Sequence, residues 1–186
     1  MKMQDKKIQV HKFLVELFGR ATTVFDLLAV TISSISFAGL VLLLKWNADI
    51  SYFKLFILTI LALDIAGGVV ANFTNGTNSY YSESLRKRYF FVFFHLLQPS
   101  ILIWIFPSEL VPISGVSLFT LTSSIVVLNI KKQYNQRIIA VMLLLFSLFL
   151  STVLNFFDPL TELVMQLFSI KLILAFSVNW ASNDKN

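Results

Sequence analysis

The sequence predicts an all-α integral membrane protein: a bundle of six transmembrane helices in one domain, residues 1–186, preceded by an amphipathic segment, residues 1–26. Apolar residues make up 56% of the chain and charged residues only 13%, which is too few charges for an ordinary soluble domain. The charges also gather between long apolar runs. A run of roughly 20 apolar residues is long enough to cross a hydrocarbon core about 30 Å thick.

The first element that we expect is an amphipathic helix over residues 8–25. Apolar residues from Val10 to Ala21 recur at helical spacing, whereas Lys12, Glu16 and Arg20 occupy the opposite face. A basic amphipathic helix of this kind lies in the plane of an anionic membrane surface. Docking against a protein partner is the alternative interpretation of the same pattern.

Six apolar runs follow that have the length of a spanning helix. They are Leu27–Leu44, Leu55–Phe73, Tyr89–Phe106, Val111–Ile130, Ile138–Phe157 and Leu163–Ala181. The first run starts after 26 residues and lacks a short apolar core with a cleavage site, so we expect a retained span and not a removed signal peptide. The sequence contains no series of alternating segments of about ten residues, which is the pattern of a membrane β-barrel.

Basic residues predict the orientation of the spans. Twelve of the 15 Lys and Arg fall on one side, in the N-terminal segment, the second and fourth connections and the C-terminal tail that contains Lys185. Cytoplasmic segments carry the Lys/Arg excess, so both termini should be cytoplasmic, most simply at a plasma membrane. The net charge of +5 is then explained by contact with anionic lipid headgroups. Nucleic-acid binding is not expected, because the cations are divided among short segments.

The composition also limits the chemistry of any site. The chain has no Cys and only two His, and neither an HxxxH nor an HExxH pattern occurs. Thiolate metal sites, disulfides and Cys nucleophiles are therefore excluded, and we expect neither a metal nor a cofactor. A Ser-His-Asp triad is not expected either, because the chain lacks a GxSxG turn.

Two charged residues lie inside the spans, Asp64 in the second and Lys171 in the sixth. Each lies ten residues from the predicted cytoplasmic end of its span, which places both roughly 15 Å deep, close to the midplane. If both were unpaired, they would cost about 5–7 kcal/mol together. We therefore expect Asp64 and Lys171 to face the interior of the bundle and to form an ion pair.

Small and polar residues share the helix face of Asp64. At about 100° per residue, Gly67, Gly68, Asn72 and Asn75 all fall within one broad sector around the carboxylate. Glycines inside a membrane helix usually let a neighbouring backbone approach closely. We assign Gly67 and Gly68 to packing, and Asn72 and Asn75 to ligand binding.

The third span supplies the expected opposite wall. Arg88, His95 and Pro99 fall on one face with Gln98 beside them, and an antiparallel connection near Tyr81 brings Gln98 level with Asp64. Pro99 lacks an amide hydrogen and its ring clashes with the carbonyl of residue 95, so we expect a kink that frees the His95 carbonyl. The imidazole of His95 exchanges protons near neutral pH, which suits a relay or a base.

Together these residues predict a polar intramembrane pocket that opens to the cytoplasm, with Asp64 and His95 as proton-transfer groups. Asn72, Asn75, Gln98 and Lys171 would bind a small ion or polar ligand, and Arg88 would stand at the mouth. The fourth span is expected to line the same space through Ser117, Thr120 and Ser124, although hydroxyls of this kind often bond only their own helix.

Three functions remain open from the sequence. The most concrete is a small ion- or proton-coupled carrier in which Asp64 takes up and releases the ion. The second is a membrane enzyme acting on a lipid-like substrate, with Asp64 or His95 as general base and Arg88 or Lys87 holding an anionic headgroup. The third is a non-catalytic membrane subunit, in which the polar residues only fix helix packing.

Overall fold

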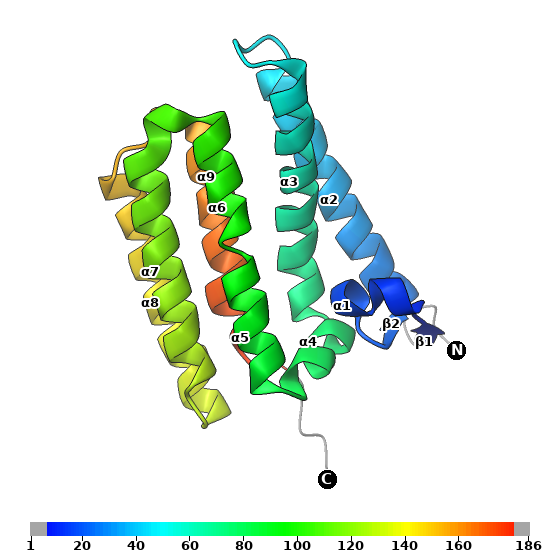
Figure 1. Cartoon of the computed structure of the whole chain (residues 1–186). Helices are drawn as coiled ribbons and strands as arrows, with labels where there is room; N and C mark the ends of the chain where they lie inside the picture. Colours follow the sequence, from blue (N-terminus) through cyan, green and yellow to red (C-terminus); the bar gives the residue numbers. More distant parts are fainter. Residues whose placement is uncertain (1–6, 181–186) are drawn as a thin grey trace.

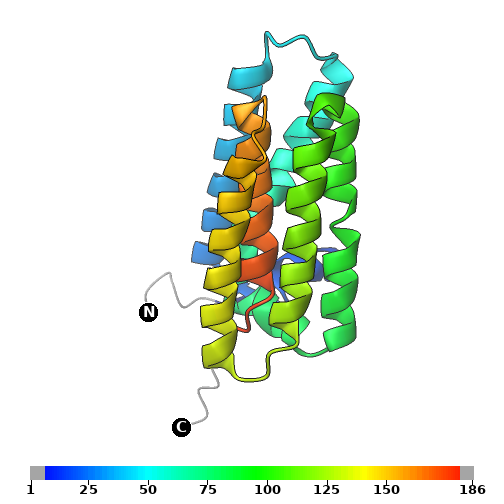
Figure 2. The same cartoon turned by 90° about the vertical axis from the view of Figure 1, so that its left-hand side faces the viewer.

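The structure is a computed structural model that describes residues 7–180, and it contains six helical segments long and apolar enough to cross a membrane. They run antiparallel to one another as a bundle (Figures 1 and 2). The expectation of a mainly helical chain with six segments able to span a membrane is thus confirmed. The predicted end of the sixth span, Ala181, and the basic residues Lys2, Lys6 and Lys185 lie outside the described residues.

The spans are built from nine helical elements in chain order. They are α2 (Val24–Lys45), α3 (Tyr52–Phe73), α5 (Leu85–Phe94) with α6 (Leu97–Ile105), η3 (Pro107–Glu109) with α7 (Leu110–Leu128), α8 (Gln133–Val153), and α9 (Pro159–Ser169) with the π-helix η4 (Ile170–Phe176). A further helix, α4 (Asn75–Ser82), connects the second and third spans.

Capping residues move several helix starts away from the hydropathy limits. Helix α2 begins at Val24 because of a capping box. The Thr23 side chain accepts a hydrogen bond from the Asp26 amide, and the Asp26 side chain accepts one from the Thr23 amide. Helix α9 begins at Pro159, because Asp158 caps it and proline suits the first helical position. The α8 helix ends at Val153, two residues before Asn155, whose φ is 58°.

The N-terminal segment is not the amphipathic helix that its periodicity predicts. Strand β1 (Lys7–Gln9) pairs antiparallel with β2 (Ala21–Thr23), and between them lie only the short helices η2 (Lys12–Leu14) and α1 (Val15–Phe18). The helix stops at Gly19, whose φ of 72° is one that other residues rarely adopt. A Cβ on Gly19 would lie 2.0 Å from the Gly76 carbonyl oxygen, so this turn is pressed against α4.

The sixth span lies in the centre of the bundle and contacts α3, α7 and α8 (Figure 1). Its buried side chains Phe168 and Leu172 join Leu58 and Ile65 of α3 and Val92 of α5 in the main hydrophobic core. The first span packs mainly against α3 at the edge of the bundle. The central position of the sixth span explains how Lys171 comes to face the second span.

One end of the bundle is held together by α4. The side chain of Asn78 donates to the Val178 carbonyl at 3.0 Å and accepts the Trp180 amide at 2.8 Å, which joins α4 to the end of the sixth span. The β1–β2 hairpin lies at this same end (Figure 1). We call it the basic end, because Arg20, Lys87 and Lys132 belong to it.

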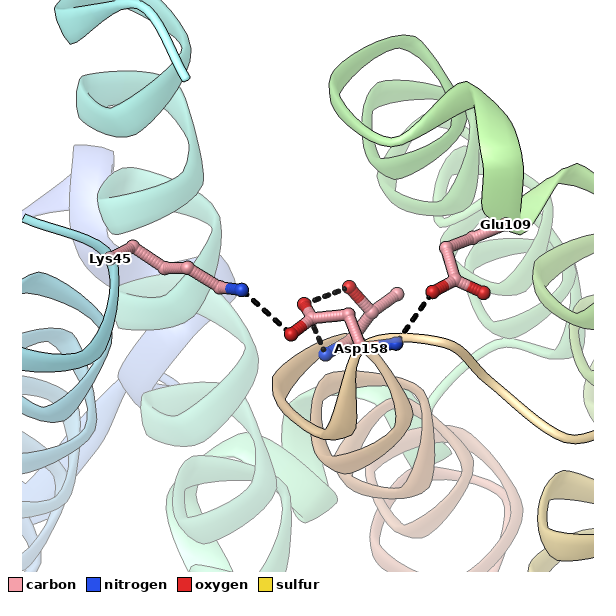
Figure 3. A network of polar contacts seen from close by, with 4 residues as sticks. Lys45, Glu109 and Asp158 are labelled. Carbon is pink, nitrogen blue, oxygen red and sulfur yellow. Dashed lines mark hydrogen bonds and ion pairs between the residues drawn. The ribbon is translucent and has the colours of Figure 1, made fainter. Parts of the chain in front are cut away.

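The opposite end is held by a polar cluster around Asp158 (Figure 3). Lys45 at the end of α2 contacts the Asp158 carboxylate at 2.6 Å, and the buried Glu109 carboxylate accepts the Asp158 amide at 2.8 Å. Burial raises the pKa of Asp158, but hydrogen bonds from Lys45 and Thr161 outweigh it and hold the pKa below its ordinary value. The cluster therefore joins three spans through an ionised carboxylate.

Candidate functional site

A cleft of about 850 Å³ lies between α3 and the broken third span. Its walls are α3 from Ile57 to Asn72 on one side and α5–α6 from Arg86 to Ile101 on the other. Tyr80 and Tyr81 of α4 and residues of α1 close it near the basic end. Lys171 of the sixth span also lines the cleft. Both charged residues that we expected inside the spans, Asp64 and Lys171, therefore border it.

Asp64 and Lys171 form the predicted ion pair. The Lys171 ammonium lies 2.9 Å from Asp64 Oδ2 and also donates to the Asp64 backbone carbonyl at 3.2 Å. The two side chains differ greatly in exposure, which is 51% for Asp64 and 2% for Lys171. The Lys171 ammonium is thus enclosed inside the bundle, whereas the Asp64 carboxylate faces the cleft.

Gln98 completes this arrangement from the third span. Its side-chain amide donates to the same Asp64 Oδ2 that Lys171 contacts, as the predicted antiparallel alignment requires. The Gln98 Oε1 atom is buried and has no hydrogen-bond partner. An acceptor of this kind inside the bundle is costly unless a ligand or water satisfies it.

The geometry of the sixth span explains why Lys171 reaches Asp64. Helix α9 ends at Ser169, and from Ile170 to Phe176 the backbone is a π-helix, a widened form that is often found at functional sites. Gly68 makes room for the lysine, because a Cβ there would lie 2.4 Å from Lys171 Cε.

Gly67 has a different neighbour. A Cβ on this residue would lie 2.2 Å from Ser34 Oγ of the first span. The two glycines therefore make room for the side chains of Ser34 and Lys171.

His95 lies where the third span breaks. Helix α5 ends at Phe94 and α6 starts at Leu97, as expected for a span that contains Pro99. The freed carbonyl that we expected is not observed, because the His95 oxygen accepts the Gln98 amide at 3.2 Å. The break aims the imidazole into the cleft, where His95 is 5% exposed.

The hydrogen bonding of His95 defines its tautomer. Nδ1 lies 2.7 Å from the Phe91 carbonyl oxygen. A carbonyl only accepts hydrogen bonds, so Nδ1 carries the proton and Nε2 presents its lone pair. In this form His95 can accept a proton through Nε2.

The two asparagines lie in different places. Asn72 lines the cleft, is buried, and its Nδ2 has no hydrogen-bond partner. Asn75 is exposed at the start of α4 and does not line the cleft. The helix α3 ends at Phe73, so the angular projection that grouped Asn75 with Asp64 does not extend to it.

Arg88 does not stand at the mouth of the cleft. It is buried and its guanidinium donates to the Phe176 carbonyl at 2.6 Å, against the ring of the same residue. The cations that line the cleft at the basic end are Arg86 and Lys87. We expected Arg88 on the face of His95, but the residues that face the cleft at this end share the helical spacing of Arg86, Phe90 and Phe94.

The fourth span does not line the cleft either. Ser117 and Ser124 donate to carbonyls of their own helix, at 2.6 and 2.8 Å. Thr120 Oγ1 lies 2.8 Å from Ser169 Oγ and 3.3 Å from Ser147 Oγ, in a buried hydroxyl cluster between α7, α8 and α9. The hydroxyls of this cluster hold the three helices together, which is the structural role that such residues often have in membranes.

The cleft is electrostatically mixed near the basic end. Arg86 and Lys87 bring positive charge, and Glu16 of α1 contributes one carboxylate. Burial, with the nearby charge of Glu16, raises the pKa of Tyr81, so its phenol stays neutral. Within residues 7–180, no three His, Asp or Glu side chains are arranged to hold a metal ion.

Comparison with known proteins gives no assignment. The chain matches no protein-family model, no curated protein and no solved structure.

Proposed function

We propose that the protein is a small ion- or proton-coupled carrier of the plasma membrane, with both termini in the cytoplasm. The observation that carries this proposal is the unequal exposure of the central pair, in which Lys171 is enclosed and Asp64 is half-exposed to a cleft. An ionisable residue inside a membrane span is costly and is generally associated with transport or proton transfer. An exposed carboxylate beside a fixed cation is a site that an incoming ion can enter.

The pair provides a physical means of coupling. A proton on Asp64 removes the negative charge that compensates Lys171, and a small cation at Asp64 competes with the ammonium for the same oxygens. Either event weakens the link between α3 and the sixth span, and with it the Gln98 contact from the third span. Ion uptake would thus alter how three spans are held around the cleft.

A vesicle experiment tests the proposal. The protein is reconstituted in vesicles of mixed zwitterionic and anionic lipid with a pH-sensitive dye inside, and a proton gradient is imposed with Na⁺ or K⁺ present. The wild type should dissipate the gradient, and Asp64→Asn should fall to the rate of protein-free vesicles. The matched control is Asp49→Asn, which removes an exposed carboxylate outside the cleft and should keep the wild-type rate.

Two outcomes contradict the carrier proposal. One is a wild-type flux no faster than that of protein-free vesicles, and the other is an Asp64→Asn flux equal to the wild type. Because Asp64→Asn leaves Lys171 without a counter-ion, the double variant Asp64→Asn with Lys171→Met is measured as well. It removes both charges, so a folded double variant without flux separates loss of function from loss of structure.

One observation favours an enzyme as the second candidate. His95 Nδ1 donates a hydrogen bond to the Phe91 carbonyl, which leaves a lone pair on Nε2. The imidazole ring lies in a cleft with apolar walls. That is the arrangement of a general base for a lipid-like substrate. His95→Asn keeps a donor for the Phe91 carbonyl but has no basic nitrogen, so it should abolish turnover of lipid detected by mass spectrometry while leaving the fold intact.

A further inference from the structure

The basic end of the cleft has no part in ion coupling, and its chemistry indicates what the carrier moves. We propose that the cleft binds one membrane lipid with a phosphate headgroup, with the phosphate at Arg86 and Lys87 and one hydrocarbon chain along the cleft. This inference rests on the proposed carrier function, for which it names the cargo.

The charge at this end is available to a ligand. Arg86 is exposed, lines the cleft and makes no ion pair with any other residue between 7 and 180. The Lys87 ammonium lies 4.2 Å from the centre of the Tyr80 ring and 3.8 Å from Glu83 Oε2. Glu83 already has a closer partner in Arg20, at 3.0 Å. A guanidinium beside an ammonium is a suitable pair of donors for a phosphate.

The rest of the cleft suits a hydrocarbon chain. Beyond the two cations, the third span contributes Phe90, Phe94, Leu97 and Ile101, and α3 contributes apolar residues opposite them. The sixteen residues from Arg86 to Ile101 span fifteen helical rises, roughly 22 Å, which is longer than the roughly 15 Å of one leaflet. A volume of about 850 Å³ lies near the upper limit for small-molecule pockets, so the cleft takes one chain and a headgroup.

The rim of the cleft would admit a lipid from the side. Phe90 is 70% exposed and Leu97 is 53% exposed, although both line the cleft. Their surfaces face the hydrocarbon region when the bundle is in a membrane, so a chain can move between the bilayer and the cleft without crossing water. A small water-soluble ligand would gain nothing from such an apolar rim.

Asn72 provides the independent observation. Its side chain is 3% exposed, lines the cleft, and presents an Nδ2 group that has no partner. It precedes the end of α3 by one residue, so it lies between the two cations and the central pair. A buried donor is costly unless it is satisfied. An ester or phosphate oxygen below the headgroup would satisfy it.

Lipid binding to the whole purified protein tests the headgroup contact. The protein is exchanged into detergent that contains equal amounts of phosphatidic acid and phosphatidylcholine, and native mass spectrometry counts the lipid retained per chain. We expect one phosphatidic acid in preference to phosphatidylcholine. Arg86→Gln with Lys87→Gln should lower that preference by roughly tenfold or more, since each cation near an anionic lipid contributes on the order of fivefold.

The matched control removes two cations from the same end of the bundle. Lys131→Gln with Lys132→Gln changes the charge equally, but neither residue lines the cleft, so the preference should stay at the wild-type value. An equal loss in both double variants would show general surface attraction and overturn the proposal. Competition by millimolar inorganic phosphate alone would also overturn it, because the site would then recognise a free anion and not a lipid.

A pair of neighbouring leucines tests the chain contact. Leu97→Trp fills the cleft, whereas Leu96→Trp adds the same ring next to it, outside the lining, and both positions are exposed enough to tolerate it. Leu97→Trp should lose the retained lipid and Leu96→Trp should keep it. Equal retention by the two variants would contradict binding of the chain in this cleft.

The binding assay also separates this inference from the carrier function. Asp64→Asn should retain the preference for phosphatidic acid while it loses proton flux, because Asp64 lies about twelve residues of helix deeper than the two cations. Proton flux without any lipid preference would overturn the cargo assignment alone. Lipid preference without flux in the wild type would leave a lipid-binding protein and overturn the carrier.

Discussion

The Asp64–Lys171 pair shows how unequal exposure changes the worth of an ion pair. Removing one partner of a buried pair is costly because the other charge remains without compensation. Here the two deletions are not equivalent, since Lys171 is enclosed and Asp64 borders a cleft that can admit water. The enclosed Lys171 therefore needs Asp64 as its counter-ion. Asp64, in contrast, can exchange its contact with Lys171 for water or an ion.

This asymmetry predicts the order of stability among variants. Asp64→Ala should lower the free energy of unfolding by about 3–5 kcal/mol, because it leaves a buried cation. Lys171→Met should cost less than half of that, because the remaining carboxylate can be hydrated, and the double variant should recover most of the loss. Reversible unfolding in mixed micelles measures all three, and equal losses in the two single variants would contradict the assignment.

Gly68 leaves the space that the Lys171 side chain occupies. A Cβ at this position would lie 2.4 Å from Lys171 Cε and 2.8 Å from its Nζ, so Gly68→Ala has to displace the ammonium from Asp64. We expect Gly68→Ala to reduce the Asp64-dependent proton flux in vesicles.

The control for Gly68 is Gly39 of α2, around which no atom lies within 4 Å of an added Cβ. Gly39→Ala should leave the flux unchanged and stabilise the helix by about 1 kcal/mol. A wild-type flux in Gly68→Ala would show that the position of the ammonium does not matter for coupling.

At the scale of elements, the opposite end of the bundle depends on Asp158. Hydrogen bonds from Lys45 and Thr161 lower its pKa below the ordinary value of 3.8, although burial acts in the other direction. A carboxyl group whose pKa is lower in the folded than in the unfolded state stabilises the fold above the unfolded pKa. That stabilisation is lost as the pH falls through the folded pKa.

The wild type should therefore lose stability below about pH 4 more steeply than Asp158→Asn. At neutral pH, Asp158→Asn should cost about 1–2 kcal/mol, because hydrogen bonds to a charged group are lost. Thermal unfolding as a function of pH measures the difference. Parallel pH profiles of the two proteins would contradict an ionised Asp158 in this cluster.

Some elements of this fold could be predicted from the sequence, and others could not. Long apolar runs were enough for six spans, because hydrocarbon thickness dictates their length. Helix limits depended on caps such as Thr23 and Asp158, which a hydropathy pattern does not register. The N-terminal periodicity predicted a helix, but the left-handed backbone at Gly19 and its contact with Gly76 produce a hairpin.

The candidate site divides in the same way. The contacts of Asp64 with Lys171 and Gln98 could be predicted from the depth of each residue in its span and from the antiparallel alignment of the spans. Helical rise and hydrocarbon thickness fix both of these quantities closely. Arg88 was placed wrongly because its face depends on rotation of the third span, which changes where the helix breaks at His95. Rotation is set by packing, and no property of the isolated helix determines it.

At the scale of the whole molecule, the cleft lies on one side of the bundle and not along its axis. The sixth span fills the centre, so in the carrier that we propose an ion would reach Asp64 between α3 and the third span. Exposed apolar side chains such as Phe90 and Leu97 line this cleft, so the proposed route would border lipid in a membrane. This distinguishes the protein from a channel with a central pore.

The absence of Cys from the sequence allows a direct test of orientation. Single cysteines at Ser82 and Lys132 should react with a membrane-impermeant thiol reagent only after cells are opened, because the basic end should be cytoplasmic. A cysteine at Asp49 should react in intact cells, since it lies at the opposite end. Labelling of Ser82→Cys in intact cells would show that the proposed orientation is inverted.

The separation of Asp64 from Lys171 along the chain has a consequence for biogenesis. The two residues lie 107 positions apart, and the lysine belongs to the sixth of the described spans. While the ribosome synthesises the three intervening spans, the second helix has no lysine to compensate its carboxylate. The pair can therefore form only after the sixth span has been synthesised, and a chain interrupted before that span keeps an uncompensated carboxylate.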